Sequence, residues 1–490
     1  MPPDAAASPL PDNGERVPTR TRIFYGIGSV SEGTKNTVFN TFLLFYYNQI
    51  LGVSGTLSGA AIFIALCVDA ITDPLVGSLS DHTHSRWGRR HPYMYSAALP
   101  MAACFFFLFN PPEGLGEGAL FAWLTTFAVL VRVAMTLYSI PSGSMVPEIT
   151  SHYDERTTLM SYRYLFGFMG GLGSVFLGYL VFFVQKDGVD YRLVPEAYRS
   201  FALVCSVVIC TTILACALGT HHLIPRLRPP PAGGLTMAGF FRELGIVLRN
   251  RSYRNVVLGL LFASAAAGFN DVVGLYMNTF FWQFTSEEIA GFVSAIFVCV
   301  LLAAALARPI SQRFDKKQAA LALTTFAVSF GPLPVFLRLF GLMPQNRDPL
   351  LFWLMFGHAG IIVGVIIAVS IIVASMITDV VDQNELETGK RQEGLILSAV
   401  TFTQKAASGI GGFVAGIALD VIAFPKGADP GTVADDKLFS LGLAVGPGLL
   451  VFYLLLLWFL SRYGITREHH RETLAEIERR RTAGENGAGD

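Results

Sequence analysis

The chain has 490 residues, of which 52% are hydrophobic and only 15% are charged, and its formal net charge is zero. Ordinary soluble domains are about 25% charged, so this composition excludes a large water-soluble enzyme, and the balanced charge argues against a nucleic-acid partner. Apolar runs of about 20 residues, the length that spans a bilayer, recur along almost the whole sequence. They indicate an integral membrane protein.

The apolar runs predict twelve transmembrane helices and therefore an all-α membrane fold. In the first half, the predicted helices cover residues 23–50, 56–80, 93–110, 118–146, 159–184 and 198–225. In the second half, they cover residues 254–282, 286–310, 317–341, 349–380, 392–422 and 438–462.

Loop charges predict the orientation. Lys and Arg concentrate before the first predicted helix, between the second and third, between the halves, after the eighth and in the C-terminal tail. Twelve spans place all these segments on one side, so the positive-inside rule predicts that both termini are cytoplasmic. The predicted parts are a cytoplasmic tail (1–22), a six-helix bundle (23–225), a cytoplasmic linker (226–253), a second six-helix bundle (254–462) and a cytoplasmic tail (463–490).

A pair of acidic residues lies inside the second predicted helix. Asp69 and Asp73 are four residues apart, so both carboxylates project from one helical face. Thr72 and Thr136 can add hydroxyl oxygens, and such a set suits Na⁺. Two like charges this close also raise the pKa of one carboxylate, so H⁺ is the alternative coupling ion. The alternative is that both carboxylates pair with arginines and only hold helices together.

Two further ionisable residues lie within predicted spans of the second half. Lys405 is surrounded by small residues that permit close helix packing. If it faces Asp69, it is a movable counter-charge that competes with a cation; otherwise it is a lysine that extends to the membrane surface. Asp271 indicates a polar cavity, and the sequence assigns this residue no more specific role.

The first half carries four more such residues, and charges within a span are costly enough to suggest function. Glu32 and Lys35 are three residues apart and either neutralise each other or contact a substrate. Arg132 and Arg163 either hold a substrate hydroxyl or carboxylate, or pair with Glu32 or Asp69.

Three segments carry a family signature. Residues 69–92 read DAITDPLVGSLSDHTHSRWGRRHP, residues 140–163 read IPSGSMVPEITSHYDERTTLMSYR, and residues 377–394 read ITDVVDQNELETGKRQEG. Together they resemble the glycoside–pentoside–hexuronide:cation symporters of the major facilitator superfamily. The resemblance implies two six-helix bundles around a central cavity that is exposed alternately to each side. It also implies a cation site at Asp69, Thr72, Asp73 and Thr136, with Lys405 beside it.

The loop that follows the acidic pair predicts a cytoplasmic latch. Gly77 lets helices approach, while Asp81 can pair with Arg86, Arg89 and Arg90. Such a latch stabilises the outward-facing state and must break in each cycle. Its charges should therefore set the conformational equilibrium and leave the binding affinity unchanged.

The substrate region departs from the family pattern. In the melibiose carriers of this family, the fourth helix bears an aspartate and a tryptophan, and the matching positions here are Ser139 and Gly143. Arg163 does match an arginine of that sugar site. The expected substrate-binding residues are therefore Arg163, Glu32, Lys35, Ser139, Asp271 and Lys405, for a substrate other than melibiose.

These observations predict cation-coupled symport of a sugar, glycoside or uronate by alternating access. A symporter of lysolipids or other amphiphiles, and a non-transporting receptor on the same fold, stay open as alternatives. We expect a monomer that acts on a small-molecule substrate within a lipid bilayer, most naturally the bacterial cytoplasmic membrane. We expect no enzymatic activity and no cofactor besides the coupling ion, Na⁺ or H⁺.

Overall fold

The computed structural model describes residues 17–150, 152–186, 188–226, 250–294, 315–388, 393–465 and 470–477, together with residues 245, 468 and 479. Within these ranges the regular structure is helical, apart from one short hairpin of β1 (Gln185–Lys186) and β2 (Val189–Asp190). The predicted all-α fold class is confirmed.

The six helices predicted for the first half are all present. The structure has α1 (Thr19–Ile27), α2 (Ser29–Phe45), α3 (Gly55–His82), α4 (His91–Leu108), α5 (Glu117–Gly143), α6 (Val146–Ile149), α7 (Tyr153–Leu177) and α8 (Pro195–Gly219). The first predicted helix is divided at Gly28 into α1 and α2. Helices α2 and α7 each continue into a π-helical turn, Tyr46–Ile50 and Gly178–Phe182. Short 3₁₀ turns cover Tyr191–Leu193 and His221–Arg226.

The second half contains α10 (Arg251–Tyr276), α12 (Lys316–Phe330), α13 (Leu333–Leu339), α14 (Pro349–Thr388), α15 (Glu393–Val421), α16 (Asp435–Leu443) and α17 (Leu449–Ser461). A π-helical turn at Met277–Phe281 extends α10, and another at Ala444–Gly448 joins α16 to α17. The helix predicted at 317–341 divides into α12 and α13, because Pro332 between them has no N–H to continue the hydrogen-bond ladder. The helix predicted at 286–310 lies partly outside the described residues.

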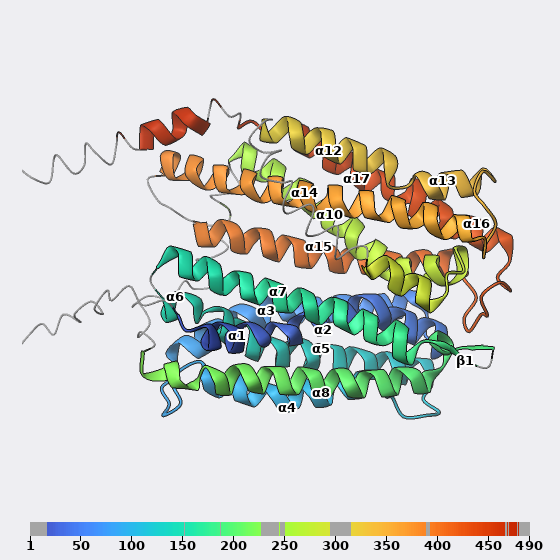
Figure 1. The fold of residues 1–490 in the computed structure, drawn as a ribbon, viewed down its shortest axis with the longest axis horizontal. Helices are drawn as coiled ribbons and strands as arrows, with labels where there is room; N and C mark the ends of the chain where they lie inside the picture. Colours follow the sequence, from blue (N-terminus) through green and yellow to red (C-terminus); the bar gives the residue numbers. More distant parts are fainter. Residues whose placement is uncertain are drawn as a thin grey trace, which may run out of the picture.

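Eight helical stretches among the described residues are long and apolar enough to cross a membrane. The twelve-helix count, the cytoplasmic position of both termini and the domain boundaries stay predictions. In Figure 1, the helices coloured blue to green lie together below those coloured yellow to red, with their long axes roughly parallel.

Glycines bring the helices into close contact. A Cβ atom at Gly33 of α2 would lie only 1.8 Å from the carbonyl oxygen of Gly167 on α7. Between the halves, α3 crosses α15 in the same way, because a Cβ at Gly416 would lie 2.1 Å from the carbonyl oxygen of Gly55. These crossings fix α2 and α3, which carry the ionisable residues, against their neighbours.

The two halves are joined at the end of the bundle where α2 ends and α3 begins. The carboxylate of Asp420, the penultimate residue of α15, accepts hydrogen bonds from the backbone N–H groups of Gly55 (2.8 Å) and Thr56 (2.7 Å). Nearby, the Tyr276 hydroxyl donates to Oδ1 of Asn48 over 2.7 Å. The rings of Phe45 and Tyr276 also meet edge to face across the halves. This end of the molecule is closed.

Candidate functional site

The acidic pair lies in the interior of α3, one helical turn apart as predicted. Asp69 is buried, with 6% of its surface exposed, and Asp73 is half-buried. The Thr136 hydroxyl on α5 lies between them, 3.1 Å from Oδ1 of Asp69 and 2.8 Å from Oδ1 of Asp73. The hydroxyl has one proton, so it donates to one carboxylate at a time and leaves the other with an open lone pair.

Positive side chains from two other helices complete this cluster. Arg132 on α5 donates to Oδ2 of Asp69 over 3.1 Å. Lys405 on α15 comes from the opposite half, and its ammonium lies 2.8 Å from Oδ2 of Asp73 and 3.6 Å from Oδ2 of Asp69. The predicted counter-charge therefore faces both carboxylates. Since 48% of the Lys405 side chain is exposed, it can withdraw into the adjoining space.

Thr72 differs from the expectation. Its hydroxyl donates to the backbone carbonyl oxygen of Asp69, 3.2 Å away on the same helix, and no bond joins it to either carboxylate in the described structure. Threonine in a helix often bonds the carbonyl one turn earlier, which explains the difference. Thr136 is thus the threonine that the structure brings to the acidic pair.

A cavity of about 510 Å³ adjoins the cluster and is bounded by both halves. Its polar and charged lining consists of Glu32, Lys35, Asn36, Asn40, Asp69, Asp73, Arg132, Thr136, Ser139, Ser264, Asp271, Gln404, Lys405 and Ser408. Five of the predicted substrate-binding residues are in this set: Glu32, Lys35, Ser139, Asp271 and Lys405. Asn36, Asn40 and Gln404 were not singled out from sequence, because neutral amides within a span carry no charge signal.

Arg163 lies outside this cavity lining. Its guanidinium donates to Oε1 of Glu32 over 2.8 Å and to the hydroxyl oxygens of Tyr25 and Ser142, each over 3.1 Å. It lines a neighbouring cavity between α2 and α7, which also includes Glu32. Glu32 therefore pairs with Arg163 and not with Lys35. Of the three partners considered for this glutamate, Lys35, Arg132 and Arg163, the structure shows Arg163.

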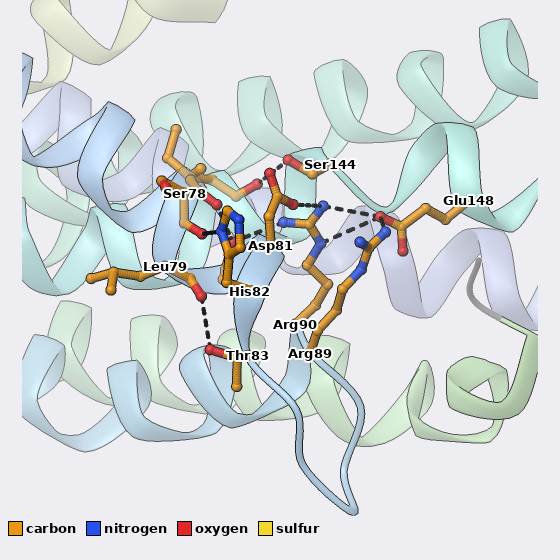
Figure 2. A network of polar contacts seen from close by, with 12 residues as sticks. Ser78, Leu79, Asp81, His82, Thr83, Arg89, Arg90, Ser144 and Glu148 are labelled. Atoms are coloured by element: carbon orange, nitrogen blue, oxygen red, sulfur yellow. Dashed lines mark hydrogen bonds and ion pairs between the residues drawn. The ribbon is translucent and has the colours of Figure 1, made fainter. Parts of the chain in front are cut away.

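Of the predicted latch residues, Asp81 lies in the last turn of α3, and Arg89 and Arg90 lie in the segment that follows it (Figure 2). Arg90 is buried, and its guanidinium lies 2.6 Å from Oδ1 of Asp81 and 3.0 Å from Oε1 of Glu148. Arg89 reaches the same Glu148 oxygen over 2.5 Å. Arg86 instead lies over the ring of Trp87, and no ion pair joins it to a carboxylate in the described structure. All these residues belong to the first half.

Glu148 is a latch residue that the sequence reading missed. It lies in α6, 58 positions beyond Arg90 along the chain. Its only signal was its place in the segment 140–163. Gly77, expected to permit helix approach, has its nearest neighbour in the Ile140 side chain, 3.6 Å from a Cβ placed on it. That is ordinary van der Waals contact, so this glycine is not required by close packing in the conformation described.

Comparisons with known proteins agree with this architecture. Residues 24–467 match the model of a family described as MFS/sugar transport protein. The chain is 26% identical to the isoprimeverose transporter of Lactiplantibacillus pentosus, over 82% of this chain and 80% of the relative. It is 22% identical to the glucuronide carrier protein homolog of Escherichia coli, over 94% and 96%. It is also 22% identical to the sodium-dependent lysophosphatidylcholine symporter 1 of Gallus gallus, over 98% and 92%.

Among solved structures, the nucleoside transporter NupG superposes with a TM-score of 0.61. The alignment covers 91% of this chain and 99% of that one, at 13% sequence identity. At this identity the similarity establishes a common fold.

Proposed function

This chain belongs to the glycoside–pentoside–hexuronide:cation symporter family of MFS/sugar transport proteins, and we propose that it carries a hydroxylated, sugar-type solute across the membrane together with Na⁺ or H⁺. It is an integral multi-pass membrane transporter and not an enzyme. The coupling ion and the solute class are the parts that we propose.

One observation supports the coupling most directly. Two carboxylates of the first half, bridged by Thr136, face the Lys405 ammonium of the second half, which lies 2.8 Å from Asp73 and 3.6 Å from Asp69. A cation that binds Asp73 must displace this ammonium, because two positive charges repel strongly in a low-dielectric interior. Binding of the cation would therefore break an ion pair between α3 and α15. Cation binding would then be linked to the relative position of the two halves.

The polar lining of the cavity favours a sugar-type solute over an amphiphile. Amides and hydroxyls from both halves, such as Asn40, Gln404 and Ser264, can bond sugar hydroxyls. A lysolipid chain would leave these groups unpaired, at a cost of about 1–3 kcal/mol each. The lysolipid symporter among the relatives keeps that alternative worth testing.

The closed end suggests which conformation is described. If the termini are cytoplasmic, the end closed by Asp420 and Tyr276 is the outer one, and the cavity is reached from the cytoplasm. In the alternating-access scheme this is an inward-facing state. The ion pairs of Arg90 with Asp81 and Glu148 are present in this state, although the latch was expected to stabilise the outward-facing one. They lie within the first half and do not join it to the second.

The test is uptake of a labelled panel of glycosides, pentoses, uronates and lysolipids into cells that express the protein, with and without Na⁺ and pH gradients. We expect one sugar class to accumulate only with a gradient, and Asp69→Asn and Asp73→Asn to abolish accumulation. The control is Asp436→Asn, which alters a carboxylate whose side chain is 72% exposed. Uptake that ignores both gradients and both variants would contradict coupling, and uptake of lysolipids alone would contradict the solute class. A panel member that binds without any flux would favour the receptor.

A further inference from the structure

Lys35 is a buried lysine without a partner among the described residues. It lies on α2 with 6% of its surface exposed, and its side chain lines the cavity. In the described part of the chain, no hydrogen bond or ion pair joins its ammonium to another residue. The nearest carboxylates along the sequence and in space are engaged, since Glu32 bonds Arg163 and Asp69 bonds Arg132.

An unpaired buried ammonium is costly enough that proteins rarely keep one without use. The surrounding charges increase this cost. Around the acidic pair, the three cations Lys35, Arg132 and Lys405 stand against two carboxylates. Glu32 lines the same side of the cavity, but its charge is balanced by Arg163. This side of the cavity therefore carries an excess positive charge, which an anionic group of a ligand would neutralise.

The opposite half presents the complementary feature. Asp271 on α10 lines the same cavity and is exposed within it, and no hydrogen bond or ion pair to it is present among the described residues. Ser264, Ala267 and Gly268 precede it on the cavity-lining face of α10. Because these side chains are small, the Asp271 carboxylate is open to a ligand. An ionised carboxylate only accepts hydrogen bonds, so it suits a group of hydroxyls.

We propose that Lys35 and Asp271 are specificity-determining residues that hold opposite ends of one substrate. Lys35 binds an anionic group, and Asp271 accepts hydrogen bonds from hydroxyls, so the site takes a hydroxylated solute that carries one negative charge, such as a sugar acid. This inference rests on the proposed transport function. It adds which side chains recognise the substrate and which charge the substrate must carry.

The placement of the two residues on different halves has a mechanical consequence. A substrate held by Lys35 of α2 and Asp271 of α10 links the halves directly, so its binding energy differs between open and closed conformations. Only such differential binding can shift a conformational equilibrium. A neutral sugar would leave Lys35 unpaired, and a fatty acid would leave Asp271 facing an apolar chain. Either of these ligands would bind without favouring the closed conformation of the two halves.

The experiment measures binding of matched ligand pairs to the purified full-length protein by calorimetry, in buffers with and without Na⁺. Each pair has the same sugar with and without a carboxylate: methyl β-D-glucuronide and methyl β-D-glucoside, then galacturonate and galactose. We expect at least one acid to bind roughly tenfold or more tightly than its neutral partner, the ratio that a charge-assisted hydrogen bond provides. Lys35→Gln should remove that preference, and Lys35→Arg should keep it.

Two further variants complete the design. Asp271→Asn should weaken the acid and its neutral partner by similar factors, because both share the hydroxyls. Lys186→Gln, in the β1–β2 hairpin, is the matched control and should change neither. Thermal unfolding of each variant checks that it folds; Lys35→Gln should be at least as stable as the wild type, since an unpaired buried charge is removed.

Equal binding of acid and neutral partner by the wild type, or equal loss of both in Lys35→Gln, would overturn the inference. Failure of the proposed function looks different, because a gradient would then drive no accumulation of any sugar in liposomes. Gradient-driven accumulation of neutral sugars with no acid preference would leave the proposed function intact and reject the roles of Lys35 and Asp271. A wild type that binds no member of any pair overturns the inference, and the accumulation assay in liposomes then decides the proposed function separately.

Discussion

At the scale of single residues, the acidic pair depends on one hydroxyl. Thr136 approaches both carboxylates, whereas Thr72 is bonded to its own helix. We predict that Thr136→Val weakens the apparent affinity for the coupling ion by roughly threefold to tenfold, the equivalent of about one hydrogen bond. Thr72→Val should change it by less than twofold. The ion concentration that gives half-maximal uptake measures both, and equal effects of the two variants would contradict this assignment.

Lys405 is the residue that couples the acidic pair to the second half. Its ammonium occupies the Asp73 oxygen that a cation would use. Lys405→Gln should therefore tighten the apparent ion affinity and slow net transport, because the empty carrier loses the charge that neutralises Asp73 during its return. Ion-dependent uptake and substrate exchange in liposomes separate these effects. A weaker ion affinity in Lys405→Gln would show that the lysine supports the site and does not compete.

At the scale of helices, the contact between α2 and α7 requires glycine at particular positions. A Cβ at Gly170 would lie 2.3 Å from the carbonyl oxygen of Val30, whereas a Cβ at Gly173 meets no described atom within 4 Å. We predict that Gly170→Ala destabilises the protein by about 1–3 kcal/mol through overpacking. Gly173→Ala on the same helix should be neutral or slightly stabilising. Thermal unfolding in detergent compares them, and similar losses would contradict the packing argument.

The positions of helices followed from hydropathy, but their interruptions did not. The apolar run of 56–80 predicted α3 to within two residues, because about 20 apolar residues have few alternatives to a spanning helix. The π-helical turns at 46–50 and 277–281 lie where the halves meet, beside the contact of Phe45 with Phe280. Such contacts leave no periodic pattern in the sequence.

The same distinction holds for the site. Asp69 and Asp73 were found because charge is rare inside a span and their spacing of four places both on one face. Glu148 and Asp420 were missed because their partners are distant along the chain: Asp420 bonds a backbone N–H 365 positions away. Tertiary structure alone brings such groups together.

At the scale of the whole molecule, Asp420 holds the two halves together at their closed end. Its carboxylate accepts from the first turn of α3, where the helix dipole also favours a negative charge. We predict that Asp420→Ala shifts the conformational equilibrium toward the state open at this end by roughly tenfold, the effect of losing about two hydrogen bonds. Asp436→Ala, another carboxylate at this end, is the control.

Spin labels at Glu113 and Asp429 can follow this opening, because both positions are exposed and lie on different halves. In a background without native cysteines, the distance distribution of Asp420→Ala should gain a longer component that the control lacks. An unchanged distribution would mean that the glycine contact between Gly55 and Gly416 suffices to close this end.

The central claim is that Asp69 and Asp73 bind an ion that moves together with the solute. The most direct measurement is solute-dependent influx of ²²Na⁺, or acidification of the lumen, in liposomes that contain the purified protein and receive an inward gradient of the transported sugar. We predict ion influx that requires the sugar in the wild type, and sugar exchange without ion influx in Asp73→Asn. Sugar-dependent ion influx that persists in Asp73→Asn would contradict the account, as would a wild type that moves the sugar with neither ion.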